Sequence, residues 1–195
     1  IAATAMATAR YFDKTLSELE LARLCVNLEP TDSTPFRQLT LFDHNEGSAQ
    51  TAGYQQPRLE ILVLESPQTL QTADYHRLDR QAALLASAPQ LEIAWQKARL
   101  ACETGSASLL GEAATLSAMA SQSILPKPGF RRVLDIVERF SLYGVSIAHS
   151  GSVMGLMLDS SHHDVEAVRA ELKKEDGNGL WPQTYLLPMV EGGVR

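Results

Sequence analysis

The amino-acid sequence predicts an α+β fold, in which helices pack on one face of an antiparallel or mixed β-sheet. Three observations indicate this fold. An apolar, strand-like run, LEILVLE, precedes a long helical region; two further apolar runs, GVSIA and VMGLML, are separated by only a few small polar residues; and a last run, TYLLPMV, follows another helix. The order of strand, several helices, two strands, helix and strand lacks the regular alternation of a Rossmann fold.

The first 28 residues are predicted to form two helices separated by the turn-like sequence FDKT. Thr15 and Ser17 are both available as the N-cap of the second helix, because hydroxyl side chains accept hydrogen bonds from unpaired helical N–H groups. Pro30 and Pro35 then prevent the helix from simply continuing, since proline removes a backbone donor. The sequence QLTLF is predicted to be a strand, and a polar connection follows it up to residue 58.

The middle of the chain is predicted to be one strand followed by four helices. Leu59–Glu65 is nearly continuously apolar, as expected for a strand covered on both faces. Three helices are predicted near Asp74–Ala86, Pro89–Glu103 and Ala107–Ser123, and a fourth spans Phe130–Phe140.

A small polar cluster, Ser150, Gly151 and Ser152, separates the strands GVSIA and VMGLML. Glycine permits the backbone angles of a tight turn and serine adds donors at little steric cost, so this tip is suited to hold a ligand with backbone N–H groups. The alternative is an ordinary hairpin turn that happens to carry serines. Gly155 is expected to let its strand approach another backbone closely. A charged helix is predicted at His162–Lys174.

Composition narrows the class of protein. The chain has 195 residues, 45% of them hydrophobic, and a formal net charge of −6, which predicts a soluble globular protein and argues against nucleic-acid binding. Cys25 and Cys102 fall on apolar helical stretches and are expected to be buried, reduced thiols, as in a cytoplasmic protein. No apolar run approaches the roughly 18 residues that a membrane span needs, so no membrane partner is expected.

A second polar island, EPTDSTPF, surrounds Asp32. Its two prolines restrict the backbone on either side, so Asp32 is expected at a fixed turn or at the cap of a new element. Asp, Ser and Thr all favour the N-cap of a helix, and this structural role is the simplest interpretation of the carboxylate.

Several segments in order resemble one superfamily. They are EPTDSTPFRQLTLFDH, LEILVLESP, DYHRL, LGEAATLSAMASQSILPKPGF and LYGVSIAHSGSVMGLMLD, followed by the C-terminal WPQTYLLPMVEGGVR. Together they are similar to the GHMP small-molecule kinases, and within these to the L-threonine kinases that serve cobalamin synthesis. The resemblance implies a GHMP C-terminal-type domain over residues 59–195 and the remainder of the N-terminal domain over residues 1–58.

The resemblance also implies a missing segment. GHMP kinases carry a phosphate loop of the form P-x-x-x-G-[LM]-x-S-S directly before the helix that the opening IAATAMATARYF resembles, and this chain begins after that loop. The chain is therefore expected to be a C-terminal portion of a longer enzyme that lacks the main ATP-phosphate loop.

The resemblance implies roles for several residues of the two polar islands. Asp32 resembles the aspartate that acts as general base or orients the acceptor alcohol in several of these kinases, with the helix cap as the rival role. Glu29 is a candidate Mg²⁺ ligand. Thr31 and Ser33 are candidate hydrogen-bond partners of the substrate. The tip at 150–152 resembles the third glycine-rich motif, which shapes the acceptor site.

Lys127 is a further candidate, because an ammonium held between two prolines is able to meet the carboxylate of an amino-acid substrate. The proline pair equally marks a rigid turn between two helices. If the resemblance holds, Asp32 and the tip at 150–152 must lie on a common cavity.

The function implied by the resemblance is phosphorylation of L-threonine to O-phospho-L-threonine, with ATP and Mg²⁺. Two alternatives stay open. The first is a non-catalytic module that binds an amino acid or a partner protein. The second is a GHMP kinase for another small alcohol, because the choice of acceptor depends on a pocket that sequence does not display.

Overall fold

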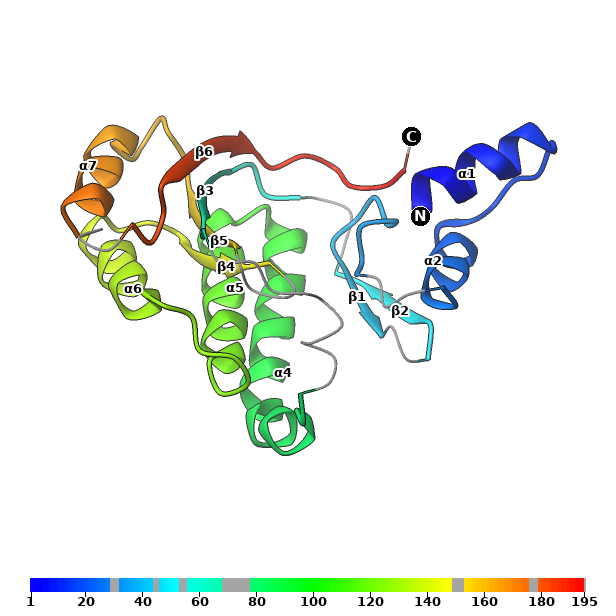
Figure 1. The fold of residues 1–195 in the computed structure, drawn as a ribbon, viewed down its shortest axis with the longest axis horizontal. Helices are drawn as coiled ribbons and strands as arrows, with labels where there is room; N and C mark the ends of the chain where they lie inside the picture. Colours follow the sequence, from blue (N-terminus) through cyan, green and yellow to red (C-terminus); the bar gives the residue numbers. More distant parts are fainter. Residues whose placement is uncertain are drawn as a thin grey trace. The chain divides into compact units, whose positions relative to one another are not determined.

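The computed structural model describes residues 1–28, 32–43, 46–52, 56–67, 78–148, 153–175 and 179–194 (Figure 1). These residues form two compact units. The first unit comprises the described parts of Ile1–Gln56 and Val190–Arg195, and the second comprises those of Pro57–Met189.

The first unit contains two helices and a small sheet. Helices α1 (Ala2–Tyr11) and α2 (Glu18–Val26) pack against each other, which confirms the two predicted helices. Strands β1 (Thr40–Asp43) and β2 (Ser48–Thr51) pair antiparallel, so the predicted strand in QLTLF is also present.

Helix α2 begins with a capping box. The Ser17 hydroxyl accepts a hydrogen bond from the Glu20 N–H at 3.2 Å, and the Glu20 carboxylate accepts one from the Ser17 N–H at 2.8 Å. These bonds, first of all the one from the Ser17 backbone, lower the pKa of the Glu20 carboxyl. Of the two predicted caps, Ser17 is therefore the one that the helix uses.

The second unit is built on a four-stranded sheet. Its strands are β3 (Glu60–Glu65), β4 (Gly144–Ile147), β5 (Val153–Leu158) and β6 (Gln183–Pro188), arranged in the order β4-β5-β3-β6. Every neighbouring pair is antiparallel. The predicted α+β class is confirmed, and of the two predicted sheet types the antiparallel one is present.

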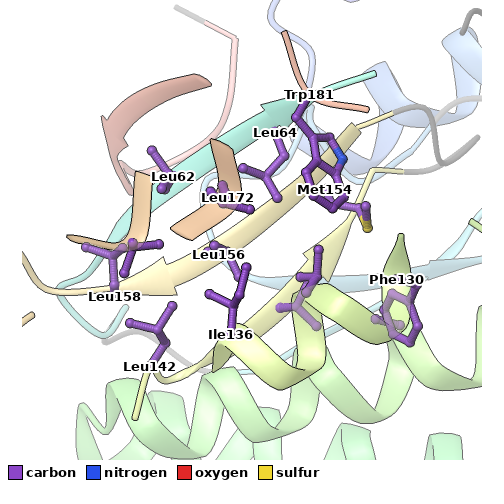
Figure 2. Close-up of a cluster of buried hydrophobic side chains, with 14 residues drawn as sticks. Leu62, Leu64, Phe130, Ile136, Leu142, Met154, Leu156, Leu158, Leu172 and Trp181 are labelled. Carbon is purple, nitrogen blue, oxygen red and sulfur yellow. The ribbon is translucent and has the colours of Figure 1, made fainter. Parts of the chain in front are cut away.

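Helices α6 (Phe130–Arg139) and α7 (Val165–Glu175) cover one face of this sheet. Figure 2 shows leucines of β3 and β5 pointing toward apolar side chains from both helices, with Trp181 at one end of the cluster. Because these side chains are almost completely removed from water, the cluster is the main source of hydrophobic stabilisation in the second unit. Its largest fully buried members are Leu62, Leu64, Leu156, Leu158, Val133, Val145 and Val168.

Two predictions differ from the structure, one about the burial of strand β3 and one about the close neighbour of Gly155 in β5. Strand β3 was expected to be covered on both faces, but only Leu62 and Leu64 are buried, whereas Ile61 and Val63 on the opposite face are half-buried. The close neighbour of Gly155 is also a side chain, not a backbone: a Cβ there would lie 2.5 Å from Cγ2 of Ile61. A bare glycine therefore makes room for the isoleucine on the neighbouring strand.

The long helical region differs from the prediction at a proline. Helix α4 runs without interruption over Gln81–Thr104, and Pro89 lies inside it rather than at the start of a separate helix. Proline there leaves one helical carbonyl without its usual donor, but the flanking residues are partly exposed, so water can satisfy that group. Gly105 then ends α4 in the left-handed conformation, with φ 68°, and α5 (Ala107–Ser121) returns beside α4.

Helix α5 lies directly against the edge strand β4. The Val145 N–H donates a hydrogen bond to the Thr115 hydroxyl at 3.0 Å, and this hydroxyl in turn donates to the Gly111 carbonyl at 2.8 Å. A Cβ on Gly111 would lie 2.1 Å from the Tyr143 carbonyl oxygen, and one on Gly144 would lie 2.2 Å from the Gly111 carbonyl oxygen. The two backbones thus touch at glycines, and the helix covers an edge that would otherwise be open.

Two other predictions about the chain concern its cysteines and its apolar runs. Cys25 and Cys102 are both buried and not joined in a disulfide, as expected. Among the described residues, no helix is long and apolar enough to cross a membrane.

Replacing Gly111 by alanine is expected to destabilise the protein, although glycine-to-alanine changes inside a helix normally stabilise it by up to about 1 kcal/mol. The added methyl group has no space beside the Tyr143 carbonyl, so helix and strand must separate; we expect a loss of roughly 2 kcal/mol or more in the free energy of unfolding. Urea unfolding measures this change. The exposed Ser108→Ala on the same helix is the control, and an unchanged or raised stability of Gly111→Ala would contradict the close contact.

Candidate functional site

The β4–β5 hairpin remains paired up to the last described residue on each strand. Ile147 pairs with Met154, and the Ala148 N–H donates to the Val153 carbonyl at 3.0 Å. The predicted tip, Ser150 to Ser152, lies outside the described residues. The two strands therefore fix the positions at which the chain enters and leaves this segment.

A cavity of about 370 Å³ lies where α4, α5 and the end of β4 meet. Four serines line it, together with apolar residues, and among the described residues of this lining none is charged. Ser146 and Ile147 of β4 belong to this lining and immediately precede the segment that contains the tip. The serines are Ser87, Ser117, Ser121 and Ser146, and the larger apolar residues are Leu84, Leu91, Ile124 and Ile147.

This serine-lined cavity was not predicted from the sequence. One signal for it is present in the helix α5, because Ser117 and Ser121 are four residues apart and so share a face. The contribution of Ser87 and Ser146 depends on how the helices pack against β4. Hydroxyls and apolar walls suit a small ligand that presents a hydroxyl and a methyl group, whereas the charges of a ligand would have to be met from outside this lining.

Lys127 lies in the turn between α5 and α6. Its N–H donates to the Gln122 side-chain oxygen at 2.8 Å, and its carbonyl accepts from the Phe130 N–H at 3.2 Å, so the residue has the structural turn role that we considered for it. Burial lowers the pKa of the Lys127 ammonium. In the sequence, Lys127 comes three residues after Ile124, which lines the cavity. Contact between the Lys127 ammonium and a substrate carboxylate stays a prediction.

Asp32 occupies a turn in the first unit. Its Oδ1 accepts a hydrogen bond from the Thr34 N–H at 3.1 Å, and the Phe36 N–H donates to the Ser33 carbonyl at 3.1 Å. The carboxylate is exposed, and this turn uses one of its two oxygens. The predicted fixed turn is therefore present, whereas the helix N-cap is wrong, because no helix begins in residues 32–39. The turn holds the side chain in one orientation without using the whole carboxylate.

The C-terminal segment holds the chain next to this turn. The Gly193 N–H donates to the Thr34 carbonyl at 3.2 Å, and the Gly192 N–H donates to the Arg37 carbonyl at 3.1 Å. A Cβ on Gly192 would lie 2.5 Å from the Phe36 carbonyl oxygen, so this approach needs glycine. These glycines were not recognised as part of the site from the sequence, because their partners are more than 150 residues away along the chain.

Comparison with known proteins decides the family. Residues 98–178 match the family described as "GHMP kinases C terminal". The whole chain is 56% identical to an L-threonine kinase of Citrobacter freundii, of which it covers 68%, and 54% identical to an L-threonine kinase of Salmonella typhimurium, of which it covers 65%. The chain belongs to the L-threonine kinase family of GHMP kinases. It spans about two thirds of the length of these relatives.

Solved structures of GHMP kinases share the fold. A putative homoserine kinase from Listeria monocytogenes matches with a TM-score of 0.64 and 14% identity over 99% of this chain and 65% of that one. Galactokinase from Lactococcus lactis, complexed with galactose, matches with a TM-score of 0.65 and 13% identity over 99% of this chain and 64% of that one. These matches confirm the predicted GHMP-type architecture.

Membership of the L-threonine kinase family leaves the individual site residues as predictions. Glu29 and Thr31 lie outside the described residues, as does the tip. Ser33 and Asp32 belong to the first unit, while the hairpin end, the serine-lined cavity and Lys127 belong to the second. The expected convergence of Asp32 and the tip therefore stays a prediction.

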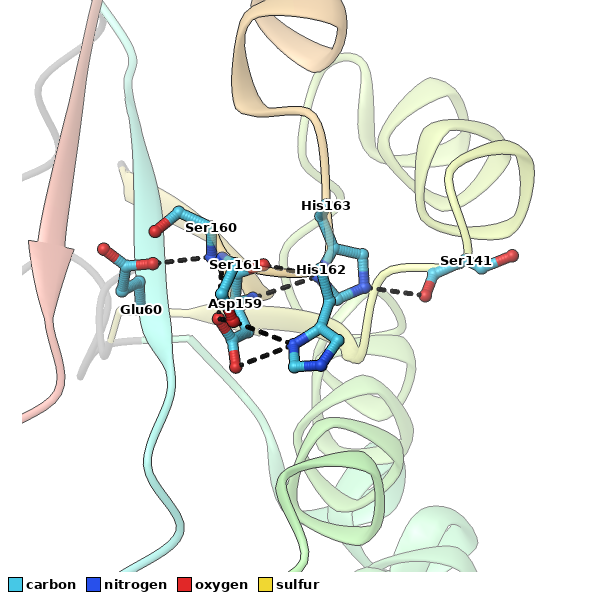
Figure 3. A network of polar contacts seen from close by, with 7 residues as sticks. All are labelled: Glu60, Ser141, Asp159, Ser160, Ser161, His162 and His163. Atoms are coloured by element: carbon cyan, nitrogen blue, oxygen red, sulfur yellow. Dashed lines mark hydrogen bonds and ion pairs between the residues drawn. The ribbon is translucent and has the colours of Figure 1, made fainter.

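A separate cluster of polar side chains lies at the end of β5 that is farther from the hairpin turn (Figure 3). The Asp159 carboxylate accepts hydrogen bonds from the Ser161 N–H at 2.8 Å and from its hydroxyl at 2.5 Å, and His162 Nδ1 lies 3.1 Å from the second oxygen. The Ser160 N–H donates to Glu60 at 2.7 Å. These bonds close the turn between β5 and α7 and attach it to β3.

His163 fastens the same turn to the segment before β4. Its Nδ1 accepts from the Asp159 N–H at 3.1 Å, its Nε2 lies 3.1 Å from the Ser141 carbonyl, and its ring meets Tyr143 edge-on. The cluster does not form a serine–histidine–aspartate relay, because the Ser161 hydroxyl and the Asp159 carboxylate both contact the same nitrogen of His162. In the part of the chain described above, no three metal-binding side chains gather. The cluster is structural.

The Asp159 turn is expected to contribute to the pH dependence of stability. Hydrogen bonds from Ser161, together with His162, lower the pKa of the Asp159 carboxyl. Because a depressed pKa means that the folded state binds the proton less tightly, this contribution is present above the unfolded pKa of about 3.9 and is lost as the pH falls through the folded pKa. Thermal unfolding of Asp159→Asn between pH 2 and 7 should therefore show a shallower loss of stability on the acid side. An acid limb as steep as that of the unmodified protein would contradict this role.

Proposed function

We propose that the protein containing this chain transfers the γ-phosphoryl group of ATP to the hydroxyl of L-threonine, forming O-phospho-L-threonine and ADP. The single observation that carries the proposal is the identity of 54–56% along all 195 residues to two L-threonine kinases. The proposal extends to a role in cobalamin synthesis in the cytoplasm, as the resemblance in the sequence implies.

In the proposed reaction, the threonine hydroxyl oxygen forms a bond to the γ-phosphorus while the bond from that phosphorus to the β,γ-bridging oxygen breaks, and the hydroxyl proton passes to a base. Asp32 is the base that we propose. Its turn supports this role, because one oxygen is fixed by the Thr34 N–H while the carboxylate stays exposed to a reactant. Holding an acceptor and a base in a fixed geometry supplies much of the catalysis of phosphoryl transfer.

Mg²⁺ is the metal that the family implies, and it would neutralise charge on the ATP phosphates. Mg²⁺ prefers oxygen ligands and often takes only one or two from the protein, the others coming from phosphates and water. A single carboxylate therefore suffices to hold it. We propose Glu29 as that ligand.

The acceptor side of the site is proposed to lie at the hairpin end. The serine-lined cavity offers hydroxyl groups and apolar walls to the side chain of threonine. We propose that Lys127 meets the threonine carboxylate and that the tip at 150–152, with Thr31 and Ser33, donates hydrogen bonds to substrate or phosphate. Partial burial, which lowers the pKa of the Lys127 ammonium, also strengthens such a charge pair.

The direct test is turnover by the full-length protein. ATP, Mg²⁺ and either L-threonine, L-serine or L-homoserine are supplied, ADP release is followed, and the phosphorylated product is identified by mass spectrometry. We expect the highest kcat/KM for L-threonine. ADP release that does not depend on any of these amino acids would contradict the proposal, and a clear preference for homoserine would assign the protein to another acceptor.

Asp32 is tested by two variants that separate its chemical role from its turn. Asp32→Asn keeps an oxygen that accepts from the Thr34 N–H but is no base, so kcat should fall by roughly 10²-fold or more with little change in the KM for threonine. Asp32→Ala removes both roles and, because the hydrogen bond to the Thr34 N–H is lost, should in addition destabilise the fold by about 1 kcal/mol. Near-normal turnover of Asp32→Asn would exclude Asp32 as the base and leave the kinase assignment standing.

A further inference from the structure

The first unit contains a cavity of about 220 Å³ whose lining is rich in cations. Arg10, Lys14 and Arg37 all line it, whereas Glu18 is the one acidic residue among the described residues of the lining. The other lining residues that the structure describes are Thr15 and apolar residues, including Met6 and Leu21. The cavity involves none of the residues that we propose to contact ATP or threonine.

The end of helix α1 is shaped so that Arg10 and Lys14 line the same hollow. The Lys14 N–H donates to the Ala9 carbonyl at 2.8 Å, and the Asp13 N–H donates to the Arg10 carbonyl at 3.1 Å. Asp13 adopts a φ of 52°, in the left-handed region, although it is not glycine. This pair of bonds around a left-handed residue is a Schellman motif, which turns the chain sharply and keeps residue 14 next to the last helical turn.

The positive charges of this cavity are only partly compensated. The closest ion pair joins Arg37 Nε and a Glu18 oxygen at 3.6 Å, with both side chains largely exposed. Within the described ranges, the side chains of Arg10 and Lys14 take part in no hydrogen bond or ion pair. Counted over the described lining residues, three cations and one carboxylate leave a local excess of two positive charges in a chain whose formal net charge is −6.

The favourable interaction of a cation with a helix C-terminus explains the position of Arg10 but not the positions of Lys14 and Arg37. Arginine in the last turn of α1 complements the negative end of the helix dipole. That effect does not explain why Lys14 and Arg37, from two other segments, line the same hollow. Cations repel one another unless an anion lies between them, so a shared ligand accounts for all three.

We propose that this cavity binds a phosphoryl group, either inorganic phosphate or the phosphate of a small monoester. A dianion matches the two uncompensated charges, whereas a carboxylate would match only one. The arginine guanidinium binds phosphate oxygens with two parallel N–H donors, and lysine acts as a point charge beside it. Arg10, Lys14 and Arg37 are all exposed, so a phosphate can reach them from solvent.

The site is tested by binding, which does not require turnover. Isothermal titration with inorganic phosphate, at fixed ionic strength, is performed on the full-length protein in the presence of a saturating non-hydrolysable ATP analogue and Mg²⁺, so that the nucleotide site is occupied. The double variant Arg10→Gln/Lys14→Gln is compared with Arg131→Gln/Lys173→Gln, which removes the same two charges from exposed positions of the second unit. Circular dichroism and thermal unfolding check that each variant folds.

We expect phosphate to bind the unmodified protein and the control variant alike, and at least about tenfold more weakly to Arg10→Gln/Lys14→Gln, since each lost contact is a charge-assisted hydrogen bond. A second titration with methyl phosphate shows whether the cavity prefers a phosphate monoester or inorganic phosphate. Either preference supports the proposed site. Should the double variant fail to fold, Arg37→Gln against Arg131→Gln gives the same comparison. Absence of phosphate binding, or equal weakening in the control, would overturn the proposal.

Discussion

Strand β5 pairs with β4 on one side and with β3 on the other, and the rest of the second unit depends on this double pairing. Without β3, the hairpin would be a two-stranded ribbon of marginal stability. Without α5, β4 would be an open edge; instead the Thr115 hydroxyl takes up the Val145 N–H and Gly111 lets the helix backbone reach the strand. The hairpin is thereby rigid up to Ala148 and Val153, beside the serine-lined cavity.

Two glycines, which have no side chain to take part in chemistry, bring the backbones together at both candidate segments, the hairpin end and the Asp32 turn. Gly111 brings α5 against β4, and Gly192 brings the C-terminal segment against Phe36, close to the Asp32 turn. In each case a methyl group would meet a carbonyl oxygen, so the backbones approach more closely than any other residue allows. The residues proposed to act in phosphoryl transfer thus depend on neighbours that contact no substrate, as expected when catalysis consists mainly of positioning.

Local patterns predicted most of the fold, and long-range packing accounts for what they missed. The strands of the hairpin, the cap at Ser17 and the buried cysteines follow from patterns within a few residues. A helix beginning at Pro89 is predicted, but α4 continues through this proline, because packing of the following residues against α5 outweighs one lost hydrogen bond. The serine-lined cavity and the Gly192 contact join segments from different parts of the sequence, so periodicity carried no signal for their combination. The role of Asp32 follows from a resemblance and that of Lys127 from its charge between two prolines, and the turn geometry of these residues alone does not determine a chemical role.

The measurement that tests the rigid hairpin most directly is amide hydrogen exchange, followed residue by residue in NMR spectra. The Val145 and Ala148 N–H groups, bonded to the Thr115 hydroxyl and to the Val153 carbonyl, are predicted to exchange as slowly as the paired amides of β3, within about an order of magnitude. Exchange of both amides at the rate of an unprotected chain would show that β4 is not held between α5 and β5. It would then contradict the account of how α5 and β5 hold the end of β4.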